Sequence, residues 1–200
     1  MFVTFEGIGG AGKTTQASLL RERLVDEGRD VVLAREPGGT PLGEQLRTLL
    51  LKGTRIGPWA ETALFTAARA ELVDEVLSTA LERGADVICD RYIDSSLAYQ
   101  GIAREIGVEQ VLTWSLPPIR GLLPDRTFLL LVDAETARAR RKNPDRIDRG
   151  DPEFARMLDR AYRELAARFP ERIVPIDGSG SVETVAEEIY GRVRELSRAD

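Results

Sequence analysis

The segment Gly7–Thr14, which reads Gly-Ile-Gly-Gly-Ala-Gly-Lys-Thr, constrains the fold of this 200-residue chain more than any other feature. It matches G-x-x-x-x-G-K-[ST], the pattern of a phosphate-binding loop between a buried strand and a helix. The surrounding sequence fits, because the apolar run at 2–5 precedes the loop and helically spaced apolar residues follow it over 15–27. The alternative, an ordinary glycine-rich turn before a helix, does not require so long a match.

The chemistry of this loop predicts a site for nucleotide phosphates. Its glycines allow successive backbone N–H groups to point at phosphate oxygens, and the helix that follows adds the partial positive charge of its N-terminus. The Lys13 ammonium can reach the terminal phosphates, and the Thr14 hydroxyl can bind Mg²⁺. The predicted phosphate-binding residues are Gly7, Ile8, Gly9, Gly10, Ala11, Gly12, Lys13, Thr14 and Thr15.

Composition narrows the class of protein. The 42% content of hydrophobic residues is enough for the core of one domain over residues 1–200. A net charge of −5 and the lack of a long basic run argue against binding to polymeric DNA or RNA. No apolar run approaches membrane-spanning length and no leader precedes the first strand, so we expect no membrane association and a cytoplasmic location. The single cysteine, Cys89, is expected to be a core residue, and the absence of histidine leaves carboxylates for any proton transfer.

The pattern of apolar residues predicts an α/β fold. Five continuous apolar runs are typical of strands that are covered on both faces: 2–5, 30–34, 86–90, 127–132 and 172–176. Helical spacing predicts helices over 15–27, 42–52, 60–83, 108–123 with an interruption at Pro117 and Pro118, 151–169 and 182–196. Strands that alternate with helices predict a three-layer, doubly wound parallel sheet of about five strands. Pro175 cannot donate to a strand ladder and therefore predicts an edge position for the last strand.

Ligands of such sheets bind beyond the carboxyl ends of the strands, and two strand ends carry suitable residues. The third strand ends in Asp90-Arg91, a Walker-B-like pattern in which the carboxylate lies near the metal of a nucleotide and the guanidinium can grip a phosphate. The alternative for Asp90 is a helix cap. The second strand ends in the turn 35–39, Arg-Glu-Pro-Gly-Gly, on the same rim. Its alternative is a plain turn with a solvated Arg35.

Three further segments could contact a ligand or serve the fold alone. Phe65 and Arg69 are four residues apart on one helix face and could hold a flat heterocycle, although Phe65 alone would suit the core. The segment 95–100, Ser-Ser-Leu-Ala-Tyr-Gln, could bind a ligand or cap a helix. The basic segment 138–146 could close over transferring phosphates or end a helix in solvent.

Together these segments resemble bacterial thymidylate kinases, which transfer a phosphoryl group from ATP to dTMP. The resemblance spans nearly the whole chain, and its most specific motifs are the Arg-Glu-Pro-Gly-Gly turn and the Ser-Ser-x-Ala-Tyr-Gln segment. It also includes Phe5-Glu6-Gly7, Leu64-Phe65, Ala67-Ala68-Arg69, Asp90-Arg91-Tyr92 and Asp145-Arg146-Ile147. It implies the fold of the P-loop kinases, ATP on the glycine loop, Mg²⁺ near Thr14 and Asp90, and a homodimer formed through the long helices.

The resemblance also implies a dTMP site. Its residues would be Arg35, Phe65, Arg69, Arg91, Ser95, Ser96, Tyr99 and Gln100. Arg35 and Arg91 would hold the dTMP phosphate, and Phe65 would stack on thymine. Arg69 would donate to a thymine carbonyl, while Tyr99 would disfavour a ribose 2′-OH.

The implied catalytic residues are Lys13, Arg91 and Arg141. Because the glycine loop lacks an arginine, the resemblance implies that the catalytic arginine comes from a basic lid at about 138–151. Arg141 is the best match, and Arg138 and Arg146 are the alternatives.

The chain departs from the family pattern at Gly9, where the family normally has Asp or Glu, and at Asp148, where Glu is usual. The carboxylate missing at Gly9 would face the acceptor nucleotide. Three other functions stay open: a kinase for another nucleoside monophosphate, a P-loop switch or ATPase, and a nucleotide-binding paralogue weakened by Gly9.

Overall fold

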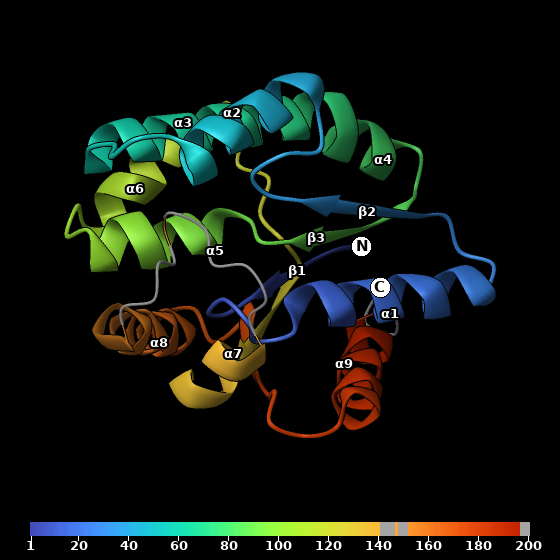
Figure 1. Cartoon of the computed structure of the whole chain (residues 1–200). Coiled ribbons are helices and arrows are strands. Elements are labelled where there is room, and N and C mark those ends of the chain that lie inside the picture. The colour runs from blue at the N-terminus through green and yellow to red at the C-terminus, as the bar shows by residue number, and fades with distance from the viewer. Residues whose placement is uncertain (141–146, 148–151, 197–200) are drawn as a thin grey trace.

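The computed structural model describes residues 1–140, 147 and 152–196, and its centre is one parallel sheet (Figure 1). The strands are β1 Phe2–Glu6, β2 Val31–Arg35, β3 Asp86–Asp90, β4 Arg126–Leu131 and β5 Ile173–Asp177. They are ordered β2-β3-β1-β4-β5, and every neighbouring pair is parallel. The predicted α/β class, the five-stranded parallel sheet and the edge position of Pro175 are confirmed.

Helices cover both faces of this sheet (Figure 1). They are α1 Lys13–Asp26, α2 Pro41–Lys52, α3 Pro58–Leu72, α4 Ser78–Glu82, α5 Ile93–Ser96, α6 Val108–Ser115, α7 Ala134–Arg140, α8 Pro152–Arg168 and α9 Val182–Leu196, with π-helical segments η1 Val73–Leu77 and η2 Leu97–Ala103 and a 3₁₀ turn η3 Pro117–Ile119. Helices α1 and α9 pack against each other on one face, while α4 and α8 contact β3, β4 and β5 from the other. This arrangement follows from right-handed crossovers.

Two expectations about the elements were wrong in detail. The helix predicted over 60–83 begins at Pro58 and passes through the π-helical segment Val73–Leu77, a change of hydrogen-bond pattern that leaves the apolar spacing almost unaltered. The run at 30–34 is not covered on both faces, because β2 is the second edge strand and Leu33 is exposed. Helix α7 was not predicted, since its polar sequence lacks an apolar stripe.

The core lies on both sides of the sheet and fixes the strand ends that carry the site. Phe5 of β1 and Phe128 of β4 are fully buried, with ring centroids 5.6 Å apart. Burial of such a ring contributes roughly 1.5–3 kcal/mol. Cys89 is a buried free thiol, as predicted. Within the described residues, no helix is long and apolar enough to cross a membrane.

Candidate active site

The glycine loop curls tightly between β1 and α1. Gly7, Gly10 and Gly12 have φ angles of 134°, 88° and 100°, which L side chains rarely adopt. Gly9 has no positive φ, so its backbone conformation does not require glycine. A Cβ on Gly10 would lie 2.0 Å from the carbonyl oxygen of Ala137, so the loop rests directly on the backbone of α7.

The two polar side chains of this loop are held inside it. The Lys13 ammonium donates to the carbonyl oxygens of Gly7 and Ile8 at 3.0 and 2.9 Å. The Thr14 hydroxyl donates to the Asp90 carboxylate at 2.5 Å, which joins α1 to the end of β3. Mg²⁺ prefers such oxygen ligands and usually takes one or two from the protein and the rest from phosphates and water. Thr14 and Asp90 therefore fit the predicted ion, whereas the described residues contain no group of three or more acidic, histidine or cysteine side chains for a protein-enclosed metal.

A cavity of about 450 Å³ opens over the loop. It is lined by Gly10, Ala11, Gly12, Lys13, Thr14, Thr15, Gln16, Arg140, Gly178, Gly180, Val182 and Val185. Its far wall comes from the segment after β5, where Arg140 donates to the carbonyl of Gly178 at 2.9 Å and Gln16 donates to that of Val182 at 3.0 Å. Sequence reasoning missed this wall, because no motif marks a segment more than 160 residues from the loop.

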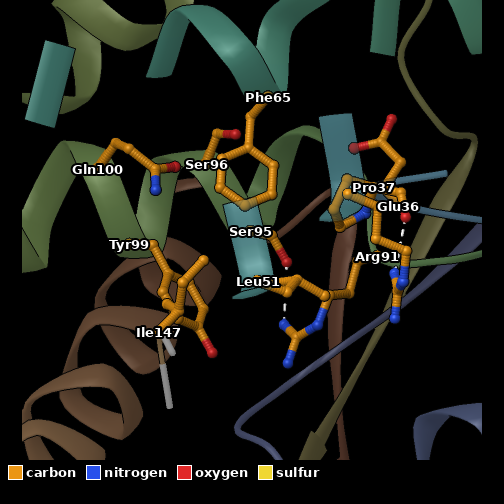
Figure 2. Close-up of a pocket in the computed structure, with 11 residues that line it drawn as sticks. Glu36, Pro37, Leu51, Phe65, Arg91, Ser95, Ser96, Tyr99, Gln100 and Ile147 are labelled. Carbon is orange, nitrogen blue, oxygen red and sulfur yellow. Dashed lines mark hydrogen bonds between the residues drawn. The ribbon is translucent and has the colours of Figure 1, made fainter. Parts of the chain in front are cut away.

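A second cavity of about 80 Å³ lies beyond β2 and β3 (Figure 2). It is lined by Glu36, Pro37, Arg47, Leu51, Phe65, Arg91, Ser95, Ser96, Tyr99, Gln100 and Ile147. Phe65 enters from α3, while Tyr99 and Gln100 come from η2 and Arg91 from the end of β3. Six of the eight residues predicted for the acceptor site line this one cavity: Phe65, Arg91, Ser95, Ser96, Tyr99 and Gln100.

The remaining two predicted acceptor residues lie elsewhere. Arg35 is about half exposed and pairs with Glu44 at 2.9 Å, outside the lining of the cavity. Arg69 is fully buried one layer behind the wall, where its Nε donates to both oxygens of Glu36 at 3.1 and 2.9 Å and its Nη2 donates to the Ser96 hydroxyl at 2.9 Å. Its Nη1 has no hydrogen-bond partner among the described residues.

Buried acids that were not predicted as site residues adjoin the cavity, among them Glu36 and Glu6. Burial raises the pKa of Glu36 to about 7, although Arg69 opposes this shift. Burial also raises the pKa of Glu6 at the end of β1, against the opposing effect of Arg91. Glu36 could have been suspected because it belongs to the Arg-Glu-Pro-Gly-Gly turn, whose Glu36-Pro37 peptide bond is cis.

Arg91 connects the two cavities. It follows Asp90, which contacts the glycine loop through Thr14, and it lines the second cavity. Its φ of 71° lies in the left-handed region, where a residue other than glycine or asparagine is uncommon. Its Nη1 donates to the hydroxyls of Ser95 and Tyr162 at 3.0 and 3.1 Å (the bond to Ser95 is dashed in Figure 2).

The predicted lid at about 138–151 lies mostly outside the described residues, and with it Arg141 and Arg146. Arg138, the other alternative, is exposed near the end of α7. Ile147 closes one side of the second cavity beside Tyr99 (Figure 2).

A phosphate loop at the end of a central parallel strand and a second cavity one strand away define a P-loop kinase, an enzyme with separate donor and acceptor sites. The thymidylate kinase family model matches residues 5–189. A thymidylate kinase of Bifidobacterium longum (strain DJO10A) is 45% identical over 203 residues, covering 98% of each chain. Another of Synechococcus sp. (strain JA-3-3Ab) is 46% identical over 194 residues, covering 97% of this chain and 95% of the relative. The chain belongs to the thymidylate kinase family and is thus a nucleoside monophosphate kinase.

A solved structure agrees with this assignment. The crystal structure of thymidylate kinase from Ehrlichia chaffeensis matches with a TM-score of 0.80 and 34% identity, covering 96% of this chain and 98% of that one.

Proposed function

We propose that this chain transfers the γ-phosphoryl group of ATP to dTMP. An oxygen of the dTMP phosphate attacks the γ-phosphorus, the bond to the β–γ bridging oxygen breaks, and dTDP and ADP result. The observation that carries the proposal is the junction at the end of β3, where Asp90 contacts the donor loop and the next residue, Arg91, lines the acceptor cavity. This junction would bring the two phosphates together in line.

Positioning and charge neutralisation would supply the catalysis, because the acceptor phosphate is already an anion and needs no strong base. Lys13 would leave the loop carbonyls and bind the terminal phosphates of ATP, while Arg91 would hold the phosphate of dTMP. Mg²⁺, held by Thr14 and Asp90, would neutralise the charge on the donor phosphates. We assign Arg141 the role of the lid arginine over the γ-phosphate.

The second cavity suits thymine deoxyribonucleotide. Phe65 would stack on the base, and the unpartnered Nη1 of Arg69 supports donation to a base carbonyl, since a buried N–H without an acceptor is costly. Ser96 and Gln100 would complete the polar edge, and Tyr99 would pack against the sugar. Arg35 would reach the phosphate after exchanging its exposed partner Glu44, a bond that costs little to break.

The test is an acceptor panel with ATP and Mg²⁺. We expect the highest kcat/KM with dTMP, lower values with dUMP, and little turnover with dGMP, UMP or CMP. Lys13→Met should lower kcat by at least about a hundredfold, because it removes a charge that stabilises the transition state. A preference for another monophosphate, ATP hydrolysis independent of acceptor, or normal turnover by Lys13→Met would contradict the proposal.

We further propose a homodimer that works in the cytoplasm. Trp59 of α3 and Trp114 of α6 are about half exposed, and their ring centroids lie 6.0 Å apart, which supports an apolar contact surface on these two helices.

A further inference from the structure

Glu6, the last residue of β1, has no solvent exposure, yet its carboxylate accepts four hydrogen bonds. Its Oε1 accepts from the backbone N–H groups of Tyr92 and Ser95 at 2.8 and 3.0 Å. Its Oε2 accepts from the hydroxyls of Ser95 and Tyr162 at 2.6 and 2.8 Å. A buried acid with four donors is held in one orientation.

The hydroxyls of Ser95 and Tyr162 connect the Glu6 carboxylate to the Arg91 guanidinium. A carboxylate can only accept, so the hydrogens of Ser95 and Tyr162 point at Glu6 and leave oxygen lone pairs for the guanidinium. Arg91 uses them, since its Nη1 donates to both hydroxyls at 3.0 and 3.1 Å. Nη1 lies 3.8 Å from the Glu6 carboxylate, so the charges attract through the two hydroxyls.

Glu6 also fixes the backbone beside Arg91. The N–H of Arg91 donates to the carbonyl of Phe5 at 3.0 Å, and the next N–H, that of Tyr92, donates to Glu6. Hydrogen bonds to the end of β1 therefore hold the peptide groups on both sides of the Arg91 Cα, which keeps Arg91 in its left-handed conformation.

We propose that Glu6 is a positioning residue for Arg91: through the hydroxyls of Ser95 and Tyr162 it sets the direction of the guanidinium that faces the acceptor phosphate. Tyr162 belongs to α8, so the same carboxylate fixes the place of α8 relative to the acceptor cavity. The kinetic consequence rests on the proposed dTMP kinase function, whereas the order of the Arg91 side chain does not.

The substitution Glu6→Gln tests this with almost no change in volume. An amide has one accepting oxygen, which the two backbone N–H groups would occupy. Its NH₂ would then donate to the hydroxyls of Ser95 and Tyr162. The hydrogens of these hydroxyls would turn toward Arg91, so that O–H donors would face the N–H donors of the guanidinium. We expect KM for dTMP to rise about tenfold to a hundredfold, the equivalent of one charged hydrogen bond, with KM for ATP within about twofold of wild type.

A second variant and a matched control separate positioning from folding. Tyr162→Phe keeps the charge of Glu6 and removes one of the two hydroxyls between Glu6 and Arg91, so it should raise KM for dTMP less than Glu6→Gln does. The double variant should have a KM for dTMP no higher than that of Glu6→Gln. Asp86→Asn removes another buried strand carboxylate, paired with Arg29 at 2.6 Å at the opposite end of β3. It should lower stability without changing KM for dTMP.

A measurement without substrate completes the test. The side-chain Nε–H resonance of Arg91, assigned with Arg91→Lys, should be ordered in the wild type and mobile in Glu6→Gln. An unchanged resonance and an unchanged KM for dTMP would overturn the proposal, as would an equal KM effect in Asp86→Asn. If Glu6→Gln does not fold, wild-type values in Tyr162→Phe would overturn it. An inactive wild type would refute the kinase function, and the resonance would still decide the role of Glu6.

Discussion

Single residues around the acceptor cavity show two ways of burying an acid. Glu6 is surrounded by hydroxyl and N–H donors, whereas Glu36 depends on one guanidinium, that of Arg69. A carboxylate with one cationic partner in a dry environment keeps a net cost of desolvation.

Glu36 makes the stability of the protein fall as pH rises through neutrality. Its pKa is raised from 4.5 to about 7 in the folded protein, so between these values the folded state holds a proton that the unfolded state has lost. The proton on Glu36 stabilises the folded state fully below pH 4.5. As the pH rises from 4.5 through 7, this stabilisation is lost, and the free energy of unfolding falls by at most about 3 kcal/mol. Urea unfolding of wild type and Glu36→Gln from pH 5 to 8 should show the wild type losing stability relative to the variant.

The control for this titration is Glu44→Gln. The pKa of Glu44 is lowered by the N–H of Gly39 and by Arg35. The difference in free energy of unfolding between Glu44→Gln and the wild type should therefore stay constant from pH 5 to 8. A wild-type advantage over Glu36→Gln that grows with pH would refute the assignment.

Sequence motifs predicted the residues whose partners are close in the chain or fixed by a strand end. The predicted residues Thr14 and Asp90 are in contact, and six of the eight residues predicted for the acceptor site share one cavity. The contact between Glu6 and Tyr162 joins residues 156 positions apart, and no local spacing encodes it. Helical spacing placed Phe65 and Arg69 on one face, yet it could not show that Glu36 neutralises Arg69 inside the protein.

At the scale of elements, helix α2, which follows the Arg-Glu-Pro-Gly-Gly turn, forms part of the wall of the acceptor cavity. Thr40 caps this helix, because its hydroxyl oxygen accepts from the N–H of Gly43 at 2.9 Å and Pro41 occupies the first turn. Helix bounds were predicted well where such signals exist, as at 182–196, and less well along 60–83, since the π-helical turn Val73–Leu77 has no marker in the sequence.

Thr40→Ala should lower the free energy of unfolding by about 1 kcal/mol, because it leaves a helical N–H without its cap. Thr48→Ala is the matched control, since the Thr48 side chain is exposed and, among the described residues, bonds only to the carbonyl of Glu44 one turn earlier. It should change stability by less than about 0.5 kcal/mol. Chemical denaturation measures both, and equal losses would show that the cap is not the cause.

On the scale of the whole molecule, the strand order β2-β3-β1-β4-β5 places the two cavities side by side. The acceptor walls follow β2 and β3, and the donor walls follow β1 and β5. Both lie at the carboxyl edge, which leaves the outer surfaces of α3 and α6 available for another purpose. Trp59 and Trp114, the two tryptophans of the chain, lie there.

We expect the wild type to sediment as a dimer at micromolar concentration and Trp59→Glu to shift toward the monomer, because a carboxylate would be buried in an apolar contact. Val25→Glu is the control, since Val25 is 41% exposed on α1, on the other side of the sheet. Analytical ultracentrifugation distinguishes the species. Dissociation by both variants, or by neither, would count against this surface.

The contact between Gly10 and the backbone of Ala137 limits how this enzyme can evolve. Any side chain at position 10 would displace α7, the helix that leads into the segment with the implied lid. Position 10 of the donor loop is therefore closed to substitution unless α7 moves as well. The opposite wall of the donor cavity, after β5, is less constrained, because a Cβ on Gly180 would meet its nearest atoms only at 3.8 Å.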